Sequence, residues 1–184
     1  RVLRESLWRI VWRQPGAVWA MDPAQYGGVY WNLVGDLASR FRFELLVAGD
    51  LPARRIVAHL AELFERYGAP MVLKRDNGSN LVHPSVDELL EAYGVLALTS
   101  PRQYPRYNGA IEYAQREIKT AVTVLTGSGA ALSTALATAP LMLNAQPRPC
   151  LGGNTACETF HQARNAFQRT FTIDRRKEVK DWIQ

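Results

Sequence analysis

The chain has 184 residues, of which 47% are hydrophobic and 21% are charged. These fractions are close to those of ordinary globular domains, so they exclude a chain that is disordered throughout and predict one domain with a sizeable core. No apolar run approaches the roughly 20 residues that span a bilayer, and no charged-then-apolar leader is present. We therefore expect an intracellular protein that does not enter a membrane.

The formal net charge of +5 is concentrated at the two ends of the chain. Residues 1–13 carry +3 and residues 164–184 carry another +3, whereas the remaining 150 residues sum to −1. Basic ends favour a polyanionic partner, because each neutralised phosphate releases counterions. Two solvated terminal helices would give the same pattern.

The only two cysteines are Cys150 and Cys157, which form a C-x6-C-x3-H string with His161. Two cysteines are too few for a disulfide framework, and the string lacks the fourth ligand and the short cysteine pair of a zinc site. The sequence therefore predicts neither a disulfide nor a structural zinc, as is usual in a reducing compartment.

The first half of the chain starts with an amphipathic helix, predicted over residues 2–13 and ended by Gln14–Gly16. Three strand-like runs follow, over residues 18–22, 30–36 and 41–47, and their short connections predict an antiparallel meander. In the third run alternation puts four apolar side chains on one face, those of Phe41, Phe43, Leu45 and Val47.

The pattern then changes to helices that alternate with strands. The apolar spacing predicts a helix after Pro52 that ends at Gly68–Pro70, with His59 on its polar side, and a short strand over residues 71–73. Ser85 and Glu88 have capping-box spacing before a helix that stops at Gly94, and residues 95–98 form the fifth strand.

The last third is predicted to be helical. Asn108 is expected to cap a helix with apolar residues from 111 to 125, and a break over residues 126–129 precedes a helix that runs to Asn144, with a kink or restart at Pro140. Residues 146–154 form a loop or hinge, and the chain past about residue 155 is helical. The order of elements predicts an α/β fold with a mixed five-stranded sheet and helical cover.

We divide the chain into three parts on this basis: a basic amphipathic helix and linker over residues 1–16, a core over residues 17–146, and a loop with a basic helical extension over residues 147–184.

Three acidic residues fall where α/β sheets gather their ligands. Asp22 ends the first strand-like run, Asp76 follows the fourth, and Glu112 lies in the first turns of the helix after the fifth. Because strand ends and the following helix termini meet at one edge of a sheet, the three carboxylates could share one site.

Such a site suits phosphodiester chemistry, because two divalent cations held by carboxylates can activate the attacking oxygen and stabilise the departing one. Each acid also has an ordinary interpretation. Asp22 could cap a turn, Asp76–Gly78 could form a type I′ turn, and Glu112 could complement a helix dipole.

The motifs around these acids resemble the integrase core that retroviral integrases share with many bacterial transposases. The segments that carry the resemblance are Trp19–Asp22, Asp36–Arg40, Tyr67–Pro70, Asp76–Ser79, Ser100-Pro101, Pro105, Asn108-Gly109 and Glu112. The last two acids are separated by 35 residues, the D-x35-E spacing of that family. The likeness runs from about residue 17 to residue 122.

The resemblance implies a ribonuclease H-like fold with sheet order 3-2-1-4-5 and helices on both faces. It also implies two Mg²⁺ or Mn²⁺ ions at Asp22, Asp76 and Glu112. The implied activity is hydrolytic nicking of double-stranded DNA at an element's end, followed by transfer of the freed 3′ end into target DNA. A homodimer or larger assembly is implied as well.

Candidate DNA-binding residues flank the third acid. Arg116 and Lys119 lie on the same helix face as Glu112 and could clamp phosphates, and Lys119 matches a lysine that the family uses against DNA ends. The loop before the helix adds Tyr104, Arg106, Tyr107 and Asn108, where stacking and backbone contacts are plausible. The alternative for Arg116 is an ion pair with Glu112 on a solvated helix.

Two other functions are compatible with these residues. One is a domesticated core that binds DNA or a partner without catalysis, and the other is a structure-specific nuclease of the same superfamily that cuts without joining.

Overall fold

The computed structural model describes residues 13–100 and 108–170, with the side chains of the last helix described through residue 163. Five strands form one sheet in the order β3-β2-β1-β4-β5. They are β1 (Val18–Tyr26), β2 (Val29–Asp36), β3 (Leu46–Ala48), β4 (Val72–Arg75) and β5 (Leu96–Thr99). β1 and β2 pair antiparallel, and β1, β4 and β5 run parallel to one another, so the predicted fold class and strand order are confirmed.

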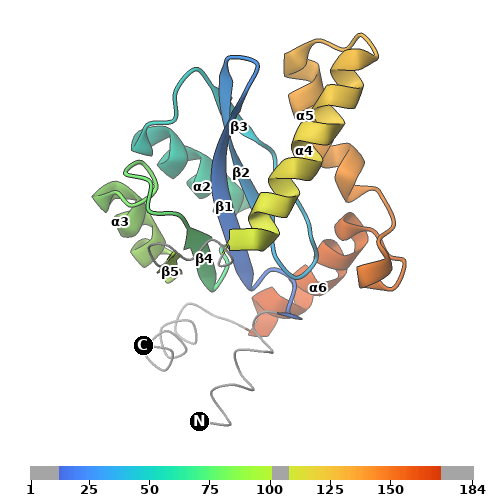
Figure 1. The fold of residues 1–184 in the computed structure, drawn as a ribbon. Helices are drawn as coiled ribbons and strands as arrows, with labels where there is room; N and C mark the ends of the chain where they lie inside the picture. Colours follow the sequence, from blue (N-terminus) through green and yellow to red (C-terminus); the bar gives the residue numbers. More distant parts are fainter. Residues whose placement is uncertain (1–12, 101–107, 171–184) are drawn as a thin grey trace.

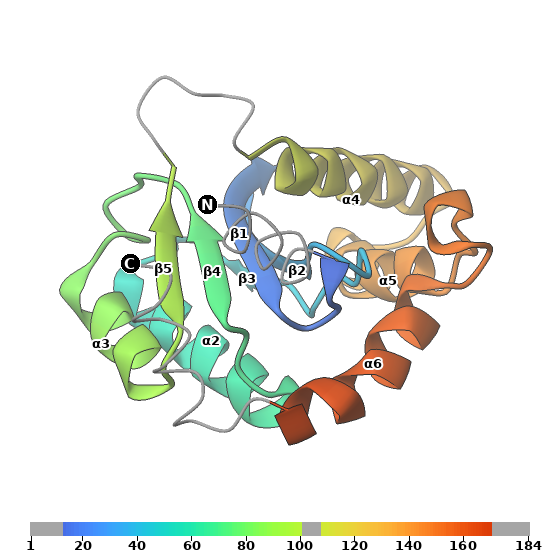
Figure 2. The ribbon, with the colours of Figure 1, turned by 90° about the horizontal axis from the view of Figure 1, so that it is seen from below.

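Helices cover both faces of this sheet (Figures 1 and 2). They are α2 (Ala53–Tyr67), α3 (Pro84–Ala92), α4 (Gly109–Gly127), α5 (Leu132–Asn144), the 3-10 helix η2 (Pro149–Leu151) and α6 (Ala156–Thr170). α2 and α3 lie on one face, and α4 and α5 lie together on the other. α5 is one continuous helix that contains Pro140, and the predicted helix over residues 2–13 lies outside the described residues.

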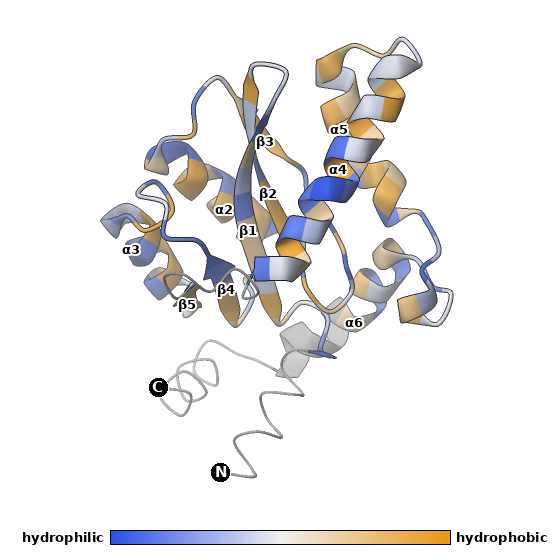
Figure 3. Ribbon diagram, in the orientation of Figure 1, coloured by the Kyte–Doolittle hydropathy of each residue, from blue (hydrophilic) through white to orange (hydrophobic). Residues whose placement is uncertain are grey.

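Alternation along the central strands divides most of the apolar side chains between two cores. Trp19 and Met21 of β1 point to the core under α2 and α3, whereas Ala20 joins Trp31 and Leu33 under α4 and α5. This period of two is what a strand buried on both faces requires. In α4, by contrast with these buried strands, the middle turns carry many hydrophilic residues (Figure 3).

The third strand differs from its prediction, because the chain bulges before it. Gly35 pairs with Arg42, and Asn32 pairs with Leu46. The two pairs are therefore three residues apart on β2 but four residues apart on the partner segment. An extra residue interrupts the ladder and turns the following side chains to the other face. Leu45 therefore packs under α4 and α5, and Val47 is exposed, although both were predicted to share a face with Phe43.

Two histidines also correct the sequence-based interpretation. His59 is buried and does not face solvent. Its Nε2 lies 2.9 Å from the carbonyl oxygen of Glu44, which lies in the bulge over residues 42–46, called the bulged segment from here on. His83, not Ser85, is the N-cap of α3, and its Nδ1 accepts a hydrogen bond from the backbone N–H of Ser85. A histidine can fill this position because its unprotonated ring nitrogen is an acceptor.

Both cysteines are exposed and free. Within residues 13–100 and 108–170 no helix is long and apolar enough to cross a membrane.

Candidate active site at the ends of β1 and β4

Asp22 and Asp76 are brought to the same edge of the sheet by strand pairing. β1 and β4 are parallel neighbours with Ala20 opposite Lys74, and each aspartate lies two residues further along its own segment. Glu112 reaches this edge from the first turn of α4, which packs against β1. Three segments that are distant in sequence therefore deliver carboxylates to one region.

The electrostatics of Asp22 reflect these neighbours. Burial is the largest cause that raises the pKa of Asp22 to about 6, followed by repulsion from Asp76 and, more weakly, from Glu112. Lys119 and a hydrogen bond from Gln115 act in the opposite direction. Asp22 thus lies within electrostatic reach of both other acids, and at neutral pH it carries its charge against their repulsion.

Asp76 is held by side chains that follow β5. The hydroxyl of Ser100 donates to Asp76 Oδ1 at 3.1 Å, and the Nδ2 of Asn108 donates to the same oxygen. Asn77 in turn donates to the backbone carbonyl of Ser100 at 2.6 Å. The orientation of the Asp76 carboxylate is therefore fixed by Ser100 and Asn108.

Asn108 does not act as the sequence predicted. It occupies the N-cap position of α4, but its side chain makes no capping hydrogen bond and is committed to Asp76. The amide thus connects the start of α4 to the end of β4, which sets the position of Glu112 relative to Asp76.

Gln115 connects α4 to the first two strands. Its Oε1 accepts from the indole N–H of Trp31 at 2.8 Å, and its Nε2 donates to the backbone carbonyl of Asp22 at 2.5 Å. Both the amide and the indole are buried. The sequence analysis assigned no role to Gln115, and its position three residues after Glu112 on the same helix was the available signal.

The cationic residues of α4 differ in their surroundings. Lys119 is half-buried and close enough to Asp22 to lower the pKa of that carboxyl. Arg116 is exposed, and its guanidinium lies over the ring of Tyr113 at 5.6 Å from the centroid. Tyr104, Arg106 and Tyr107 lie outside the described residues.

The acids fit a divalent cation by their chemistry, since carboxylate oxygens are the ligands that Mg²⁺ and Mn²⁺ prefer. Within the described ranges, however, no group of three His, Cys, Asp or Glu side chains is arranged closely enough to hold a metal ion. Glu112 is exposed, and an Asp76 oxygen is engaged by Ser100 and Asn108. The three carboxylates are neighbours without forming a closed ligand set.

Comparison with known proteins gives distant relatives. No protein-family model matches the chain. An uncharacterized protein of Caenorhabditis elegans is 25% identical over 151 residues, which are 80% of this chain and 12% of that protein. The Gag-Pol polyprotein of feline leukemia virus is 30% identical over 125 residues, which are 62% of this chain and 7% of the polyprotein. The chain therefore spans a small part of the length of either relative.

The fold itself is matched more completely. The crystal structure of the catalytic core domain of BIV integrase matches with a TM-score of 0.71 at 22% sequence identity, and the match covers 83% of this chain and 98% of that one. The two chains share their fold over nearly the whole of the solved domain.

Proposed function

From the ribonuclease H-like fold of a retroviral integrase catalytic core, which this chain has, and from its distant homology to Gag-Pol polyproteins, we propose that it is the catalytic core of a metal-dependent DNA recombinase. Its substrates are double-stranded DNA at the ends of a mobile element and in a target. Its reactions are hydrolytic nicking and strand transfer, performed by a homodimer or larger assembly.

The observation that carries this proposal is the electrostatic strain on Asp22. Desolvation and two neighbouring carboxylates disfavour its charged form. Like charges gathered in a partly buried site lower stability unless something compensates them, so an arrangement of this kind is typical of a functional site. A cation bound among the three acids would remove that strain.

Asp22, Asp76 and Glu112 are the proposed ligands of two Mg²⁺ or Mn²⁺ ions, which would activate the attacking oxygen and stabilise the departing one. Ser100 and Asn108 orient Asp76, and Gln115 fixes the backbone of Asp22. Arg116 and Lys119 lie one and two turns from Glu112, respectively, and are the proposed clamps for DNA phosphates.

In the first reaction a water oxygen forms a bond to phosphorus while the bond to O3′ breaks, which leaves a 3′-hydroxyl and a 5′-phosphate. In the second the 3′-hydroxyl oxygen attacks a target phosphodiester and displaces another O3′. Neither reaction needs a covalent intermediate with the protein, so no side chain has to act as the nucleophile.

A nicking and strand-transfer assay with Mn²⁺ tests the proposal. We expect Asp76→Asn to lose both products while DNA affinity is kept or raised, because one negative charge is removed and the Oδ1 acceptor for Ser100 and Asn108 is retained. The matched control is Glu91→Gln, which neutralises an exposed acid on α3 away from the site and should leave activity unchanged.

Equal cleavage by wild type and Asp76→Asn would contradict the catalytic assignment. Nicked products that are never joined would indicate a structure-specific nuclease. Salt-sensitive DNA binding with no turnover would indicate a catalytically silent core.

A further inference from the structure

A second polar site lies on the other flank of α4. A cavity of about 530 Å³ opens between the turn after β2, the first half of α4 and the start of η2. Arg40, Arg42 and Arg148 line it together with Glu117, Tyr113 and Cys150. We call it the arginine pocket. None of the proposed catalytic acids contributes to it.

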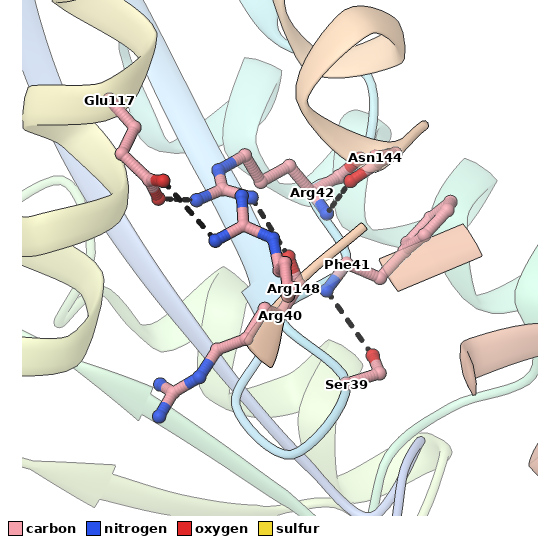
Figure 4. Close-up of polar contacts among 7 residues, drawn as sticks. All are labelled: Ser39, Arg40, Phe41, Arg42, Glu117, Asn144 and Arg148. Carbon is pink, nitrogen blue, oxygen red and sulfur yellow. Dashed lines mark hydrogen bonds and ion pairs between the residues drawn. The ribbon is translucent and has the colours of Figure 1, made fainter. Parts of the chain in front are cut away.

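Two of the arginines converge on one carboxylate (Figure 4). The Nη2 of Arg42 pairs with Glu117 Oε2, and the Nη1 of Arg148 lies 3.2 Å from Glu117 Oε1. The side chains of Arg42 and Arg148 are only 2% and 12% exposed. Two guanidinium groups are therefore largely withdrawn from water with a single carboxylate between them.

Several N–H groups of this pair lack acceptors. Arg42 Nη1 donates to the carbonyl of Arg40 at 3.0 Å, but Arg42 Nε and both Nε and Nη2 of Arg148 have no hydrogen-bond partner in the described part of the chain. Buried N–H groups without acceptors are costly, more so when they belong to a charged group. Both arginines line the cavity while these donors are covered by neighbouring atoms, so an oxyanion that enters between the side chains would give the donors acceptors.

The charge balance points the same way. Glu117 offsets one of the two buried arginines, and Arg40 adds a third positive charge at an exposed position. Asp36 also lines the pocket, and together with Glu117 it leaves the three arginines one net positive charge; its oxygens accept from the backbone N–H of Gly16 and from Ser39. Burial and the nearby Arg148 lower the pKa of Arg42 to about 9, so its guanidinium stays protonated at neutral pH.

We propose that the arginine pocket binds a terminal phosphate, either inorganic phosphate or a phosphomonoester such as the 5′-phosphate of a nucleic-acid strand. Guanidinium groups recognise phosphate oxygens through paired, charge-assisted hydrogen bonds, and the free N–H groups of Arg42 and Arg148 supply them. This proposal does not depend on catalysis at Asp22, Asp76 and Glu112.

The recessed position of the donors selects a terminal phosphate over an internal one. A phosphodiester carries a sugar on both sides, so it needs an open groove in which the strand can continue. Arg42 lines the pocket with a side chain that is almost fully buried, so only a group attached on one side has room to approach it. Arg40 at the exposed rim is placed to meet the remainder of a larger ligand.

Cys150 provides a direct probe, because its exposed thiol lines the pocket, whereas Cys157 is exposed on α6 and does not. The rates at which a thiol reagent modifies both cysteines are measured in the full chain, without a divalent metal, in chloride and in phosphate at equal ionic strength. We expect phosphate to slow the modification of Cys150 and to leave Cys157 unchanged.

Variants separate binding from a purely structural ion-pair network. Arg148→Gln and Arg42→Gln each remove charged donors and should weaken phosphate protection of Cys150 by about tenfold or more, whereas Arg40→Gln tests the rim without disturbing a buried group. Arg55→Gln is the matched control, since that arginine is exposed on α2 and pairs with Asp50. Each protection is expressed as the ratio of the two rates within one variant, and only variants whose circular dichroism spectrum matches that of the wild type are compared.

A strand end and free phosphate are distinguished with an oligonucleotide that carries a 5′-phosphate or a 5′-hydroxyl. Protection by the phosphorylated strand at lower concentration than inorganic phosphate assigns the ligand as a strand end, and protection at equal concentrations assigns free phosphate. Identical Cys150 rates in chloride and phosphate would overturn the proposal, as would protection that persists undiminished in Arg148→Gln and Arg42→Gln. Phosphate protection of Cys150 is measured without a divalent metal and without nicking, so its outcome is independent of whether the proposed catalytic function is right.

Discussion

Among single residues, Asp36 combines full burial with three hydrogen bonds. Its oxygens accept from the N–H of Gly16 at 2.8 Å and from the N–H and hydroxyl of Ser39 at 2.8 and 2.5 Å. Burial nevertheless dominates and raises the pKa of Asp36 from 3.8 to about 6. The folded protein therefore holds this proton through a pH range in which the unfolded chain has released it.

The pH dependence of stability follows from that difference. Between about pH 4 and pH 6 the native state binds more protons at Asp36 than the unfolded state does, so this group's contribution to the free energy of unfolding falls as pH rises, by roughly 3 kcal/mol in all. Asp36→Asn cannot titrate and should flatten that part of the profile. Urea denaturation of both proteins from pH 4 to pH 8 measures the difference, and parallel profiles would show that Asp36 titrates normally.

Gln115 is the second residue whose loss we expect to matter. Gln115→Ala removes hydrogen bonds to the Trp31 indole and the Asp22 carbonyl and leaves the buried indole N–H unpaired. We expect the free energy of unfolding to fall by about 2–4 kcal/mol, since a lost buried bond and a small cavity add. Thr120→Ala, at an exposed position of the same helix, is the control in chemical denaturation. A loss equal to that control would mean that water replaces both bonds.

At the scale of elements, α5 is fastened to the bulged segment by one amide. The Oδ1 of Asn144 accepts from the backbone N–H of Arg42 at 2.9 Å, and its Nδ2 donates to the carbonyl of the same residue at 2.7 Å. Asn144→Ala should lower the free energy of unfolding by about 2–3 kcal/mol, because two buried backbone groups lose their partners. Thermal unfolding beside Gln146→Ala, an exposed neighbour, checks this. Asn144→Asp keeps the acceptor oxygen but loses the donor, so its free energy of unfolding should lie between those of the wild type and Asn144→Ala.

Local patterns predicted most elements because each reports on burial of one face. The period of α2 and the stop at Gly68 are visible in the sequence, and so is the apolar run Val18–Met21 that begins β1. The bulge before β3 was not predictable, because alternation in Phe41–Val47 continues through it, whereas Asn144 and the pairing with β2 decide the register. His59 was misassigned for the same reason, since its partner is a carbonyl of the bulged segment.

The candidate site likewise has residues that could be predicted from the sequence and contacts that could not. Asp22, Asp76 and Glu112 could be selected from sequence, because strand ends and D-x35-E spacing are local or countable features. Contacts between distant segments left no such signal: Asn108 was expected to cap α4 but holds Asp76, and Arg42 and Arg148 meet across 106 positions. Arg42 and Arg148 lie in no recognisable motif, and arginines in such segments are expected to have solvated side chains.

For the whole molecule, the sheet separates two apolar cores, and α6 contributes to the one under α2. Ala156 and Phe160 are buried there, and the Phe160 ring stacks on Phe41 with centroids 4.6 Å apart. Phe43 and Tyr67 lie around the same ring. The helix therefore completes the core from outside the sheet, and its packing is coupled to the bulged segment and to α2.

This coupling predicts a global effect of a change in α6. Phe160→Ala removes a ring that is 1% exposed, so we expect a loss of about 3–5 kcal/mol in the free energy of unfolding. If α6 belongs to one cooperative unit, amide hydrogen exchange should accelerate in α2 and β2 as much as in α6. Faster exchange confined to α6 would instead make it an appendage that unfolds alone. Gln162→Ala, at an exposed position of the same helix, is the control and should leave exchange in α2 unchanged.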